Sequence, residues 1–229
     1  MWKAKVFTLY PEFFPGILGI GLYQKALEKK IWSLEIINIR DYSSDKHNTV
    51  DDTPFGGGSG MLMRADVVAN ALDKNISNSD EQTIYLSPKG KKFDQAYAKK
   101  LLNKNLNIIC GHFEGVDQRL LETRNIKEVS VGDFILSGGE VGAFVVIDSI
   151  VRLIPGVLGN NASLNEETFE NNLLEYPQYT KPQKWEKNDV PEVLLSGDHA
   201  KIKDWRLEQS KDITRRRRPD LWEKYKKKK

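Results

Sequence analysis

The run Ser130-Val131-Gly132-Asp133-Phe134-Ile135-Leu136-Ser137-Gly138-Gly139-Glu140 joins a short strand-like segment to a long stretch with a broad apolar face. The apolar residues of that stretch recur at helical spacing and are Val141, Phe144, Val145, Ile147, Ile150 and Val151. Ser137, followed three residues later by Glu140, matches a capping box at a helix start. This pairing explains Glu140 structurally, so we predict no catalytic role for it. A strand, a glycine-rich turn and a helix in this order predict one unit of an α/β domain.

The same alternation continues outward along the chain. Short β-branched or aromatic runs alternate with amphipathic stretches, a pattern typical of an α/β domain with a largely parallel sheet. Strands are predicted at 3–9, 33–39, 83–86, 107–110 and 128–131. Helices are predicted at 11–29, 65–73, 93–103, 116–124 and from 137 onward, the first with Pro11 in its first turn.

The composition changes after Pro155-Gly156. Residues 1–159 are predicted to form the α/β domain. Residues 160–172 are polar and weakly periodic, which predicts a mobile linker. Residues 173–229 are predicted to form a small helical domain, with one helix from 195–198 to about 209 and another beginning at Pro219.

The overall composition excludes several classes of protein. With 229 residues, 39% hydrophobic and 29% charged, the chain is too apolar for a disordered protein. One cysteine, Cys110, forms no internal disulfide, and three histidines cannot complete a clustered Cys/His zinc site with it. The first ten residues lack a signal-peptide pattern, and no apolar run approaches the ~18 residues of a membrane span. We expect a soluble protein of the reducing cytoplasm.

Positive charge is concentrated at the C-terminal end. Residues 197–229 hold thirteen Lys and Arg against six Asp and Glu, a net charge of +7, while the rest carries −4. Most of the positive charge comes from Arg215-Arg216-Arg217-Arg218 and residues 226–229. Trp205, Trp222 and Tyr225 are interleaved with the basic residues. Such a mixture favours a surface that neutralises phosphates and stacks on bases. The alternative is a frayed, solvated basic tail.

Glycine-rich loops follow the predicted strands, where open α/β sheets form their ligand crevices. Residues 51–61 hold four glycines in five positions, which favours a clamp or hinge that brings backbone amides near a ligand. A flexible linker is the alternative. The chain contains no Walker A pattern and no G-x-G-x-x-G after its first strand, so a Rossmann-type nucleotide site is not expected.

Three more loops point to the same edge of the sheet. They span 85–90, 110–119 and 130–140. In the second loop Glu114 lies between two glycines and is predicted to contact a ligand, whereas Asp117 fits a helix N-terminal acid equally well. In the third, glycines bracket an apolar run suited to an adenine bound through backbone hydrogen bonds.

Six segments in the same order closely resemble the bacterial tRNA (guanine-N1)-methyltransferases of the TrmD family, in the SPOUT superfamily. The resemblance extends from about residue 3 to residue 222. The segments are 51–61, 85–88, 111–117, 131–140, Arg152-Leu153-Ile154-Pro155-Gly156-Val157-Leu158-Gly159 and Leu194-Leu195-Ser196-Gly197-Asp198-His199.

The resemblance implies a SPOUT-type α/β fold with a deep trefoil knot, which pattern reading cannot find because knots are rare. It also implies S-adenosylmethionine bound in a bent form and a homodimer whose active sites lie at the subunit interface. The implied cofactor-binding residues are Tyr85, Leu86, Ser87, Pro88, Gly111, Glu114, Val131, Gly132, Asp133, Phe134, Ile135, Leu136, Gly138 and Gly139.

The implied reaction methylates N1 of the guanosine 3′ of the anticodon, at tRNA position 37. N1 must lose a proton, so a base is needed beside it and a cation near O6. The family's base and arginine correspond to Glu167 and Arg152, and Asp51 is expected to orient the guanine or the arginine. The alternatives are a solvated linker acid for Glu167 and a helix C-terminal cation for Arg152. Implied contacts to the tRNA anticodon stem-loop are Gly57, Gly58, Ser59, Gly60, Ser196, His199 and Arg206.

The chain departs from the family pattern at several positions. Glu167 replaces the usual aspartate, Lys181 replaces an arginine and Gln178 replaces a histidine. Asn171-Asn172 replaces a turn that often holds glycine, and asparagine tolerates the same left-handed backbone as glycine. The family's Mg²⁺ has no carboxylate cluster here, so RNA and cofactor would hold the ion. Two other functions stay open: a noncatalytic RNA-binding SPOUT protein and a SPOUT 2′-O-ribose methyltransferase.

Overall fold

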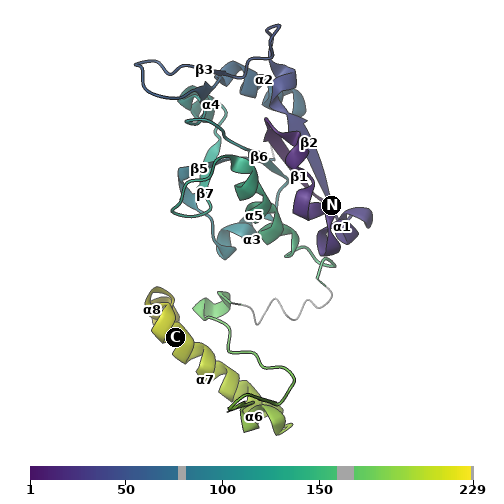
Figure 1. Cartoon of the computed structure of the whole chain (residues 1–229), viewed down its shortest axis with the longest axis vertical. Helices are drawn as coiled ribbons and strands as arrows, with labels where there is room; N and C mark the ends of the chain where they lie inside the picture. The colour runs from purple at the N-terminus through teal and green to yellow at the C-terminus, as the bar shows by residue number, and fades with distance from the viewer. Residues whose placement is uncertain (77–80, 159–167, 228–229) are drawn as a thin grey trace. The chain divides into compact units, whose positions relative to one another are not determined.

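The computed structural model describes residues 1–76, 81–158 and 168–227. The chain divides into two compact units, Met1–Gly159 and Asn160–Lys229 (Figure 1). We call them the sheet unit and the C-terminal unit. No helix in the described ranges is both long and apolar enough to cross a membrane.

The sheet unit is built on one parallel five-stranded sheet with the strand order β2-β1-β6-β5-β7. The strands are β1 (Trp2–Thr8), β2 (Trp32–Asn38), β5 (Gln82–Lys92), β6 (Leu106–Ile109) and β7 (Lys127–Ser130). All five predicted strands are present, and all their ends lie within one residue of the prediction apart from the end of β5. The predicted parallel α/β sheet is therefore confirmed. Strand order alone does not define a knot, so the trefoil knot stays a prediction.

β5 continues through a segment that we predicted to be a loop. Its pairing with β7 is interrupted by a register shift between Leu86 and Lys91. At Gly90, a Cβ would lie 2.6 Å from the Cα of Val129. Only glycine permits this approach, so the chain returns to β7 after a bulge instead of leaving the sheet.

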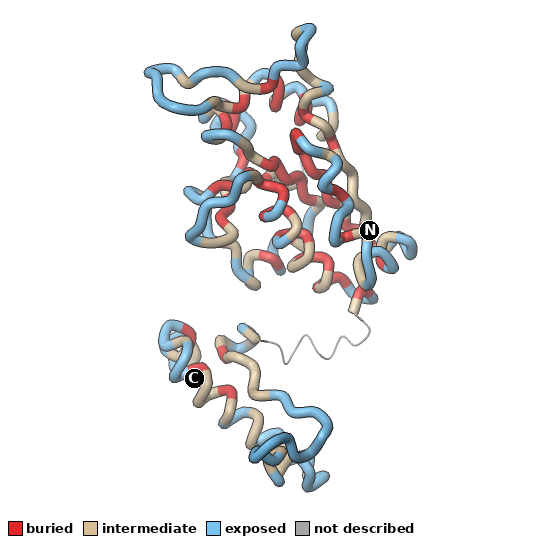
Figure 2. The backbone as a smooth tube through the Cα atoms, in the orientation of Figure 1, coloured by how far each residue is buried: buried red, intermediate tan, exposed pale blue. Residues whose placement is uncertain are grey.

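Helices cover both faces of the sheet, as Figure 1 shows. Phe7, Tyr85 and Ile109 belong to a buried cluster with residues of α2 and α4. Their strand neighbours Val6 and Ile108 are fully buried on the opposite face, because successive side chains of a strand alternate. Figure 2 shows the buried residues concentrated in the strands and on the helix sides that face them. The helices are α1 (Gly21–Glu28), α2 (Ala65–Asn75), α3 (Gln95–Leu101), α4 (Gln118–Thr123) and α5 (Gly139–Val151).

The long helix predicted at 11–29 is wrong. The segment instead forms two 3₁₀ turns, η1 (Pro11–Phe13) and η2 (Gly16–Gly19), followed by the short α1. Pro15 has no N–H for a helical hydrogen bond, and Gly16 and Gly21 have left-handed φ angles of 47° and 62°. The segment packs against α5, where the ring centroids of Phe14 and Phe144 are 4.8 Å apart.

Two helices begin later than predicted because an aspartate caps each of them. Asp94 accepts a hydrogen bond from the amide of Tyr97 at 2.8 Å and precedes α3. Asp117 accepts one from the amide of Arg119 at 2.9 Å and precedes α4. An Ncap residue is not itself helical, so each helix starts after it. The structure thus confirms a helix N-terminal role for Asp117.

The C-terminal unit is mainly helical and also contains an unpredicted hairpin. Its helix α7 extends eight residues beyond the predicted end, and Asp198 caps it by accepting a hydrogen bond from the amide of Lys201 at 3.1 Å. Asn171 and Asn172 have φ angles of 51° and 60°, which confirms the predicted left-handed turn. Most of the predicted linker, 160–172, falls outside the described residues. The elements are η5 (Glu170–Asn172), β8 (Lys184–Trp185), β9 (Asn188–Asp189), α6 (Glu192–Leu195), α7 (His199–Arg217) and α8 (Pro219–Lys227).

Candidate active site

Three of the predicted cofactor segments meet: residues 85–88 within β5 and the loops that follow β6 and β7. The amide of Gly139 donates to the carbonyl of Gly111 at 2.9 Å. A Cβ at Gly139 would lie 2.6 Å from the Cα of Cys110, and one at Gly111 would lie 2.6 Å from the hydroxyl of Tyr85. Both positions therefore need glycine because other chain segments lie too close. We call the segments 85–88, 110–115 and 131–139 the glycine cradle.

The side chains from β5 line one part of the cradle. Tyr85 is buried, and burial together with the nearby Glu128 carboxylate raises its pKa to about 12, against a backbone hydrogen bond from Val116. The phenol is therefore neutral at physiological pH. Leu86 packs along α5, with its Cδ1 3.1 Å from where a Cβ at Gly142 would lie. Ser87 is also buried, whereas Pro88 is exposed.

The loop 131–136 presents apolar side chains to the surroundings. Ser130 ties its start, because its hydroxyl donates to the carbonyl of Gly132 at 3.0 Å. Phe134, Ile135 and Leu136 are all exposed, Ile135 at 81%. Val131 and Asp133 lie at the start of the same loop, where Asp133 is also exposed. The apolar run predicted to face an adenine is thus an exposed part of the glycine cradle.

The glycine-rich segment 51–61 forms a hairpin between β3 (Asp51–Asp52) and β4 (Leu62–Met63). Its four glycines, Gly56, Gly57, Gly58 and Gly60, have left-handed φ angles between 80° and 122°. Ser59 lies exposed between the last two. We call residues 51–63 the glycine hairpin. Because its two ends pair with each other, it is a structured hairpin and not a free linker.

The glycine hairpin is joined to the glycine cradle. The amide of Glu114 donates to the carbonyl of Met61 at 3.0 Å, and the amide of Met63 donates to the carbonyl of Gly115 at 2.9 Å. A Cβ at Gly60 would lie 2.6 Å from Oε1 of Glu114. The structure therefore brings the predicted guanine-side loop, with Asp51 at its base, against a predicted cofactor loop.

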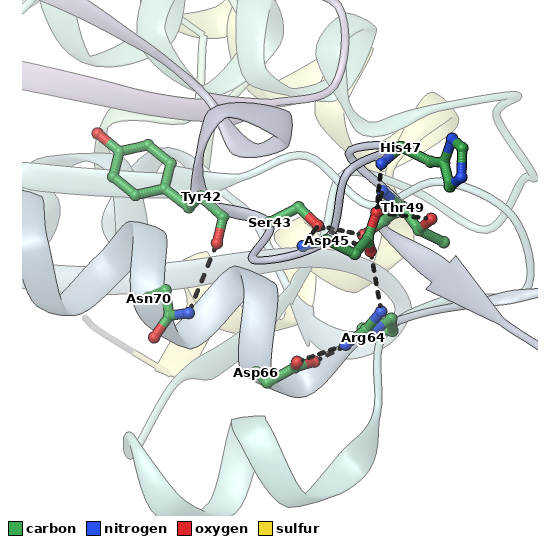
Figure 3. A network of polar contacts seen from close by, with 8 residues as sticks. All are labelled: Tyr42, Ser43, Asp45, His47, Thr49, Arg64, Asp66 and Asn70. Carbon is green, nitrogen blue, oxygen red and sulfur yellow. Dashed lines mark hydrogen bonds and ion pairs between the residues drawn. The ribbon is translucent and has the colours of Figure 1, made fainter.

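A polar network that sequence reasoning missed holds the chain just before Asp51 (Figure 3). Asp45 accepts hydrogen bonds from the amides of His47 at 2.8 Å and Thr49 at 3.1 Å. The pKa of Asp45 falls to about 2, chiefly because of the Thr49 amide. Arg64 lies 2.6 Å from Asp66 and 3.4 Å from Asp45. The signal available in the sequence was an aspartate placed to bond backbone amides two and four residues later.

Glu140 does not take part in the predicted capping box. The Ncap of α5 is Gly138, and no side-chain hydrogen bond caps this helix. The carboxylate of Glu140, 2% exposed, instead accepts a hydrogen bond from the hydroxyl of Thr8 at 2.5 Å. It also lies 2.8 Å from Nε2 of His112. The capping prediction failed because these tertiary partners compete for the side chain.

Of the three predicted catalytic residues, the structure describes Asp51 and Arg152. Asp51 lies in the glycine hairpin, next to the glycine cradle. Arg152 is the C-cap of α5, which begins at the cradle and whose thirteen residues span about 20 Å. Beyond it, a Cβ at Gly156 would lie 3.7 Å from Ile31, which precedes β2 at the opposite edge of the sheet. Glu167 lies outside the described residues.

The charge of Arg152 acts on Asp148, one turn earlier in α5. Burial raises the pKa of Asp148, and the positive charge of Arg152 opposes that rise. Arg152 thus ends the helix as the predicted C-terminal cation, whose charge is favourable to the helix dipole.

The predicted RNA contacts of the C-terminal unit lie around α6 and α7. Ser196 follows α6 and its hydroxyl donates to the carbonyl of Val193 at 2.7 Å, while His199 is the exposed first residue of α7. The guanidinium of Arg206 lies over the ring of Tyr176, 4.7 Å from its centroid. A pocket of about 450 Å³ next to them is lined by aromatic, amide and cationic side chains, including Tyr179, Lys181 and Gln178.

Three of the four consecutive arginines, Arg215 to Arg217, belong to a helix and not to a frayed tail. Arg215, Arg216 and Arg217 form the last turn of α7 and are exposed. Asp212, one turn earlier, lies 3.3 Å from Arg215 and 2.6 Å from Arg216. The helix holds these charges close together on its exposed last turn, and clustered positive charge attracts phosphates.

No group of three or more His, Cys, Asp or Glu side chains within residues 1–76, 81–158 and 168–227 is placed to hold an ion.

Comparison with known proteins identifies the family. A family model described as tRNA (Guanine-1)-methyltransferase TrmD matches residues 2–224. The chain belongs to this family. A tRNA (guanine-N(1)-)-methyltransferase of Pelagibacter ubique (strain HTCC1062) is 68% identical over 228 residues, covering 99% of this chain and all of that protein. The protein of the same name from Bartonella tribocorum is 55% identical over 98% of this chain and 96% of that protein. The one from Mesorhizobium japonicum is 56% identical over 96% of this chain and 96% of that protein.

Membership of the TrmD family confirms the resemblance and the α/β class that it implied. The relationship covers both units, so the C-terminal unit is part of the family pattern and not an unrelated extension. The roles of individual residues in cofactor and RNA binding stay predictions.

Proposed function

We propose that this protein transfers the methyl group of S-adenosylmethionine to N1 of the guanosine at tRNA position 37. The observation that carries the proposal is the match to the TrmD family along residues 2–224. The meeting of the glycine cradle and the glycine hairpin supports it, because these loops are the predicted cofactor and guanine sites. We place the activity in the cytoplasm, where its tRNA substrate would be found.

The glycine cradle fits S-adenosylmethionine. Gly111 and Gly139 let the cradle segments pack closely against one another, which gathers their backbone amides and carbonyls in one place where a ligand could bind. The neutral, buried Tyr85 adds an aromatic wall, and Ile135 and Leu136 offer apolar surface to an adenine. When bound, S-adenosylmethionine supplies a methyl group on a positively charged sulfur.

The chain's own residues would prepare the guanine. N1 carries a proton and becomes nucleophilic once a base removes it, and we assign that base to Glu167. Negative charge then builds on O6, where Arg152 would stabilise it. Asp51, at the base of the glycine hairpin, would orient the guanine or Arg152.

This assignment requires two subunits. Arg152 lies about one helix length, about 20 Å, from the cradle of its own chain, so a partner would place its Arg152 and Glu167 there. Exposed apolar side chains flank α5 and mark a surface for this pairing. Phe13, Ile17, Ile20, Val141 and Val145 are between 46% and 68% exposed. Such an exposed apolar surface is typical of an interface.

The proposed RNA partner is the anticodon stem-loop. The helical basic run and the stacked rings of Trp222 and Tyr225, with centroids 5.4 Å apart, suit an RNA backbone and its bases. Mg²⁺, if required, would be held by RNA and cofactor, since the described residues offer no cluster for it.

The test uses purified protein, S-adenosylmethionine and two anticodon stem-loop transcripts that differ only by guanine or adenine at position 37. We expect methylation of the guanine transcript alone, and mass spectrometry of the digested RNA should place the methyl on the base. Equal methylation of both transcripts would refute the specificity.

The two remaining functions give other outcomes in the same assay. A methyl group on the ribose would indicate a 2′-O-methyltransferase. RNA binding without any methyl transfer would indicate a noncatalytic protein, the alternative that Glu167 in place of aspartate motivates.

A further inference from the structure

A buried carboxylate connects the elements that carry the glycine cradle. Glu140, in the first turn of α5, is 2% exposed, and Thr8, the last residue of β1, is fully buried. The Thr8 hydroxyl donates to Oε1 of Glu140 at 2.5 Å. Nε2 of His112 lies 2.9 Å and 2.8 Å from the two carboxylate oxygens. Because a carboxylate only accepts hydrogen bonds, the His112 tautomer with its proton on Nε2 donates here.

The three side chains come from three separate segments. β1 and β6 are neighbouring parallel strands, and His112 follows β6 while Glu140 follows the loop after β7. Thr8 is itself held, because its hydroxyl accepts from the amide of Tyr10 at 2.9 Å. The rings of Tyr10 and His112 then meet edge to face, with centroids 4.8 Å apart. The cluster therefore links the ends of two strands to the start of α5.

The cluster also fills the space next to a cradle glycine. A Cβ at Gly138 would lie 2.8 Å from Nε2 of His112 and 2.7 Å from Oε2 of Glu140. The adjacent Gly139 bonds to Gly111, the residue before His112. The loop after β6 and the loop after β7 are therefore joined twice. One link is the contact between His112 and Glu140, and the other is the adjacent hydrogen bond between Gly139 and Gly111.

The folding of α5 does not depend on this cluster alone. Ala143, Val146, Ile147 and Ile150 of the helix are fully buried and provide its packing. An ionised carboxylate taken out of water costs free energy unless hydrogen bonds compensate, and apolar side chains would fill this place at lower cost. Its position at the N-terminus of α5 lowers the cost, because the helix dipole favours negative charge there.

We propose that Glu140 is a positioning residue that, through Thr8 and His112, sets the spacing of the loops after β6 and β7 for cofactor binding. It acts on the cradle and touches neither the methyl donor nor the guanine. The inference rests on the proposed function, since it assigns the cofactor to this cradle.

The main variant is Glu140→Gln, which keeps the shape and removes the charge. We expect S-adenosylmethionine to bind about tenfold more weakly by calorimetry, since one charge-assisted hydrogen bond is replaced by a poorer one. The KM for S-adenosylmethionine should rise by the same factor, while kcat at saturation and the KM for tRNA stay within about twofold. The matched control is Asp73→Asn, which removes a carboxylate that bonds Arg124 at 2.7 Å on the surface of the same unit, and should bind as wild type.

A second pair of variants decides the case if Glu140→Gln fails to fold. Thr8→Val keeps the shape and loses the hydroxyl, so it should weaken cofactor binding. Thr8→Ser keeps the hydroxyl and should bind the cofactor with wild-type affinity. Folded Glu140→Gln protein with wild-type cofactor affinity would overturn the inference, and so would equal affinities of the two Thr8 variants. If the wild type itself binds no S-adenosylmethionine, the proposed function fails instead.

Discussion

Single glycines decide whether the cradle can form. The effect of each depends on which atoms an added Cβ would meet. At Gly139 the neighbour is the backbone of Cys110, which cannot move away without displacing β6. At Gly142, one turn further, the nearest atom is the end of the flexible Leu86 side chain. Two glycines in one helix therefore carry different constraints.

The first prediction compares alanine at these two positions. Gly139→Ala should lower S-adenosylmethionine affinity by about tenfold or more, because the new methyl group forces the two loops apart. Gly142→Ala should bind normally and melt at the wild-type temperature or above, because alanine favours a helix by about 1 kcal/mol. Calorimetry and thermal unfolding measure both effects. Equal affinities would refute the steric argument.

A second prediction concerns Asp45, whose pKa is lowered to about 2. A carboxyl group with a lowered native pKa stabilises the fold above its unfolded pKa of about 3.9, and the effect is lost as pH falls through the native value. The urea midpoint of the wild type should therefore drop between about pH 4 and pH 2. Asp45→Asn should have a lower midpoint at pH 7 and a flatter profile in that window. Parallel profiles of the two proteins would refute the assignment.

At the scale of the element, side-chain caps and helix-breaking residues explain where helices begin and end. Asp94, Asp117 and Asp198 cap α3, α4 and α7, and each satisfies an amide that the first helical turn leaves unpaired. The segment before α1 is not a continuous helix, because Pro15 has no N–H to donate to a helical hydrogen bond and Gly16 has a left-handed backbone. α7 continues through Arg217, so Arg215, Arg216 and Arg217 belong to this helix.

The third prediction tests that helical basic surface. Arg217→Gln should weaken binding of the anticodon stem-loop and lower the slope of log affinity against log salt by about one, the value for one phosphate contact. Lys100→Gln, an exposed lysine of α3, removes the same charge from the sheet unit and serves as the control. Fluorescence titrations at several salt concentrations measure the slope. An equal decrease in both variants would indicate general attraction in place of a surface on α7.

At the scale of the whole molecule, the length of α5 separates groups that the proposed reaction must bring together. The cradle lies at its first residue and Arg152 directly after its last. A rigid helix cannot fold back on itself, so one chain holds the predicted cofactor site at one end of α5 and the arginine at the other. Two chains related by twofold symmetry can supply both ends to each site.

The fourth prediction follows from this geometry. Arg152→Ala and Gly139→Val should each be inactive as homodimers, and coexpression of the two should restore about a quarter of the wild-type activity. Half of the dimers would then be mixed, each with one intact cradle facing one intact Arg152. Methyl transfer to the guanine transcript is the measurement. Coexpressed Gly111→Val and Gly139→Val provide the control that should stay inactive, and failure of the first pair to recover activity would place the arginine in its own subunit's site.

The sequence by itself determined the strands, because alternating and continuous apolar runs depend only on which faces are buried. It also determined the family, since the ordered loop segments carry that information directly. The tertiary structure decided what depends on neighbours distant in sequence: the bulge that returns β5 to β7, and the two partners that draw Glu140 away from its local cap. Contacts such as Gly139 with Gly111 were beyond local patterns, because their energy exists only once separate strands have been brought side by side.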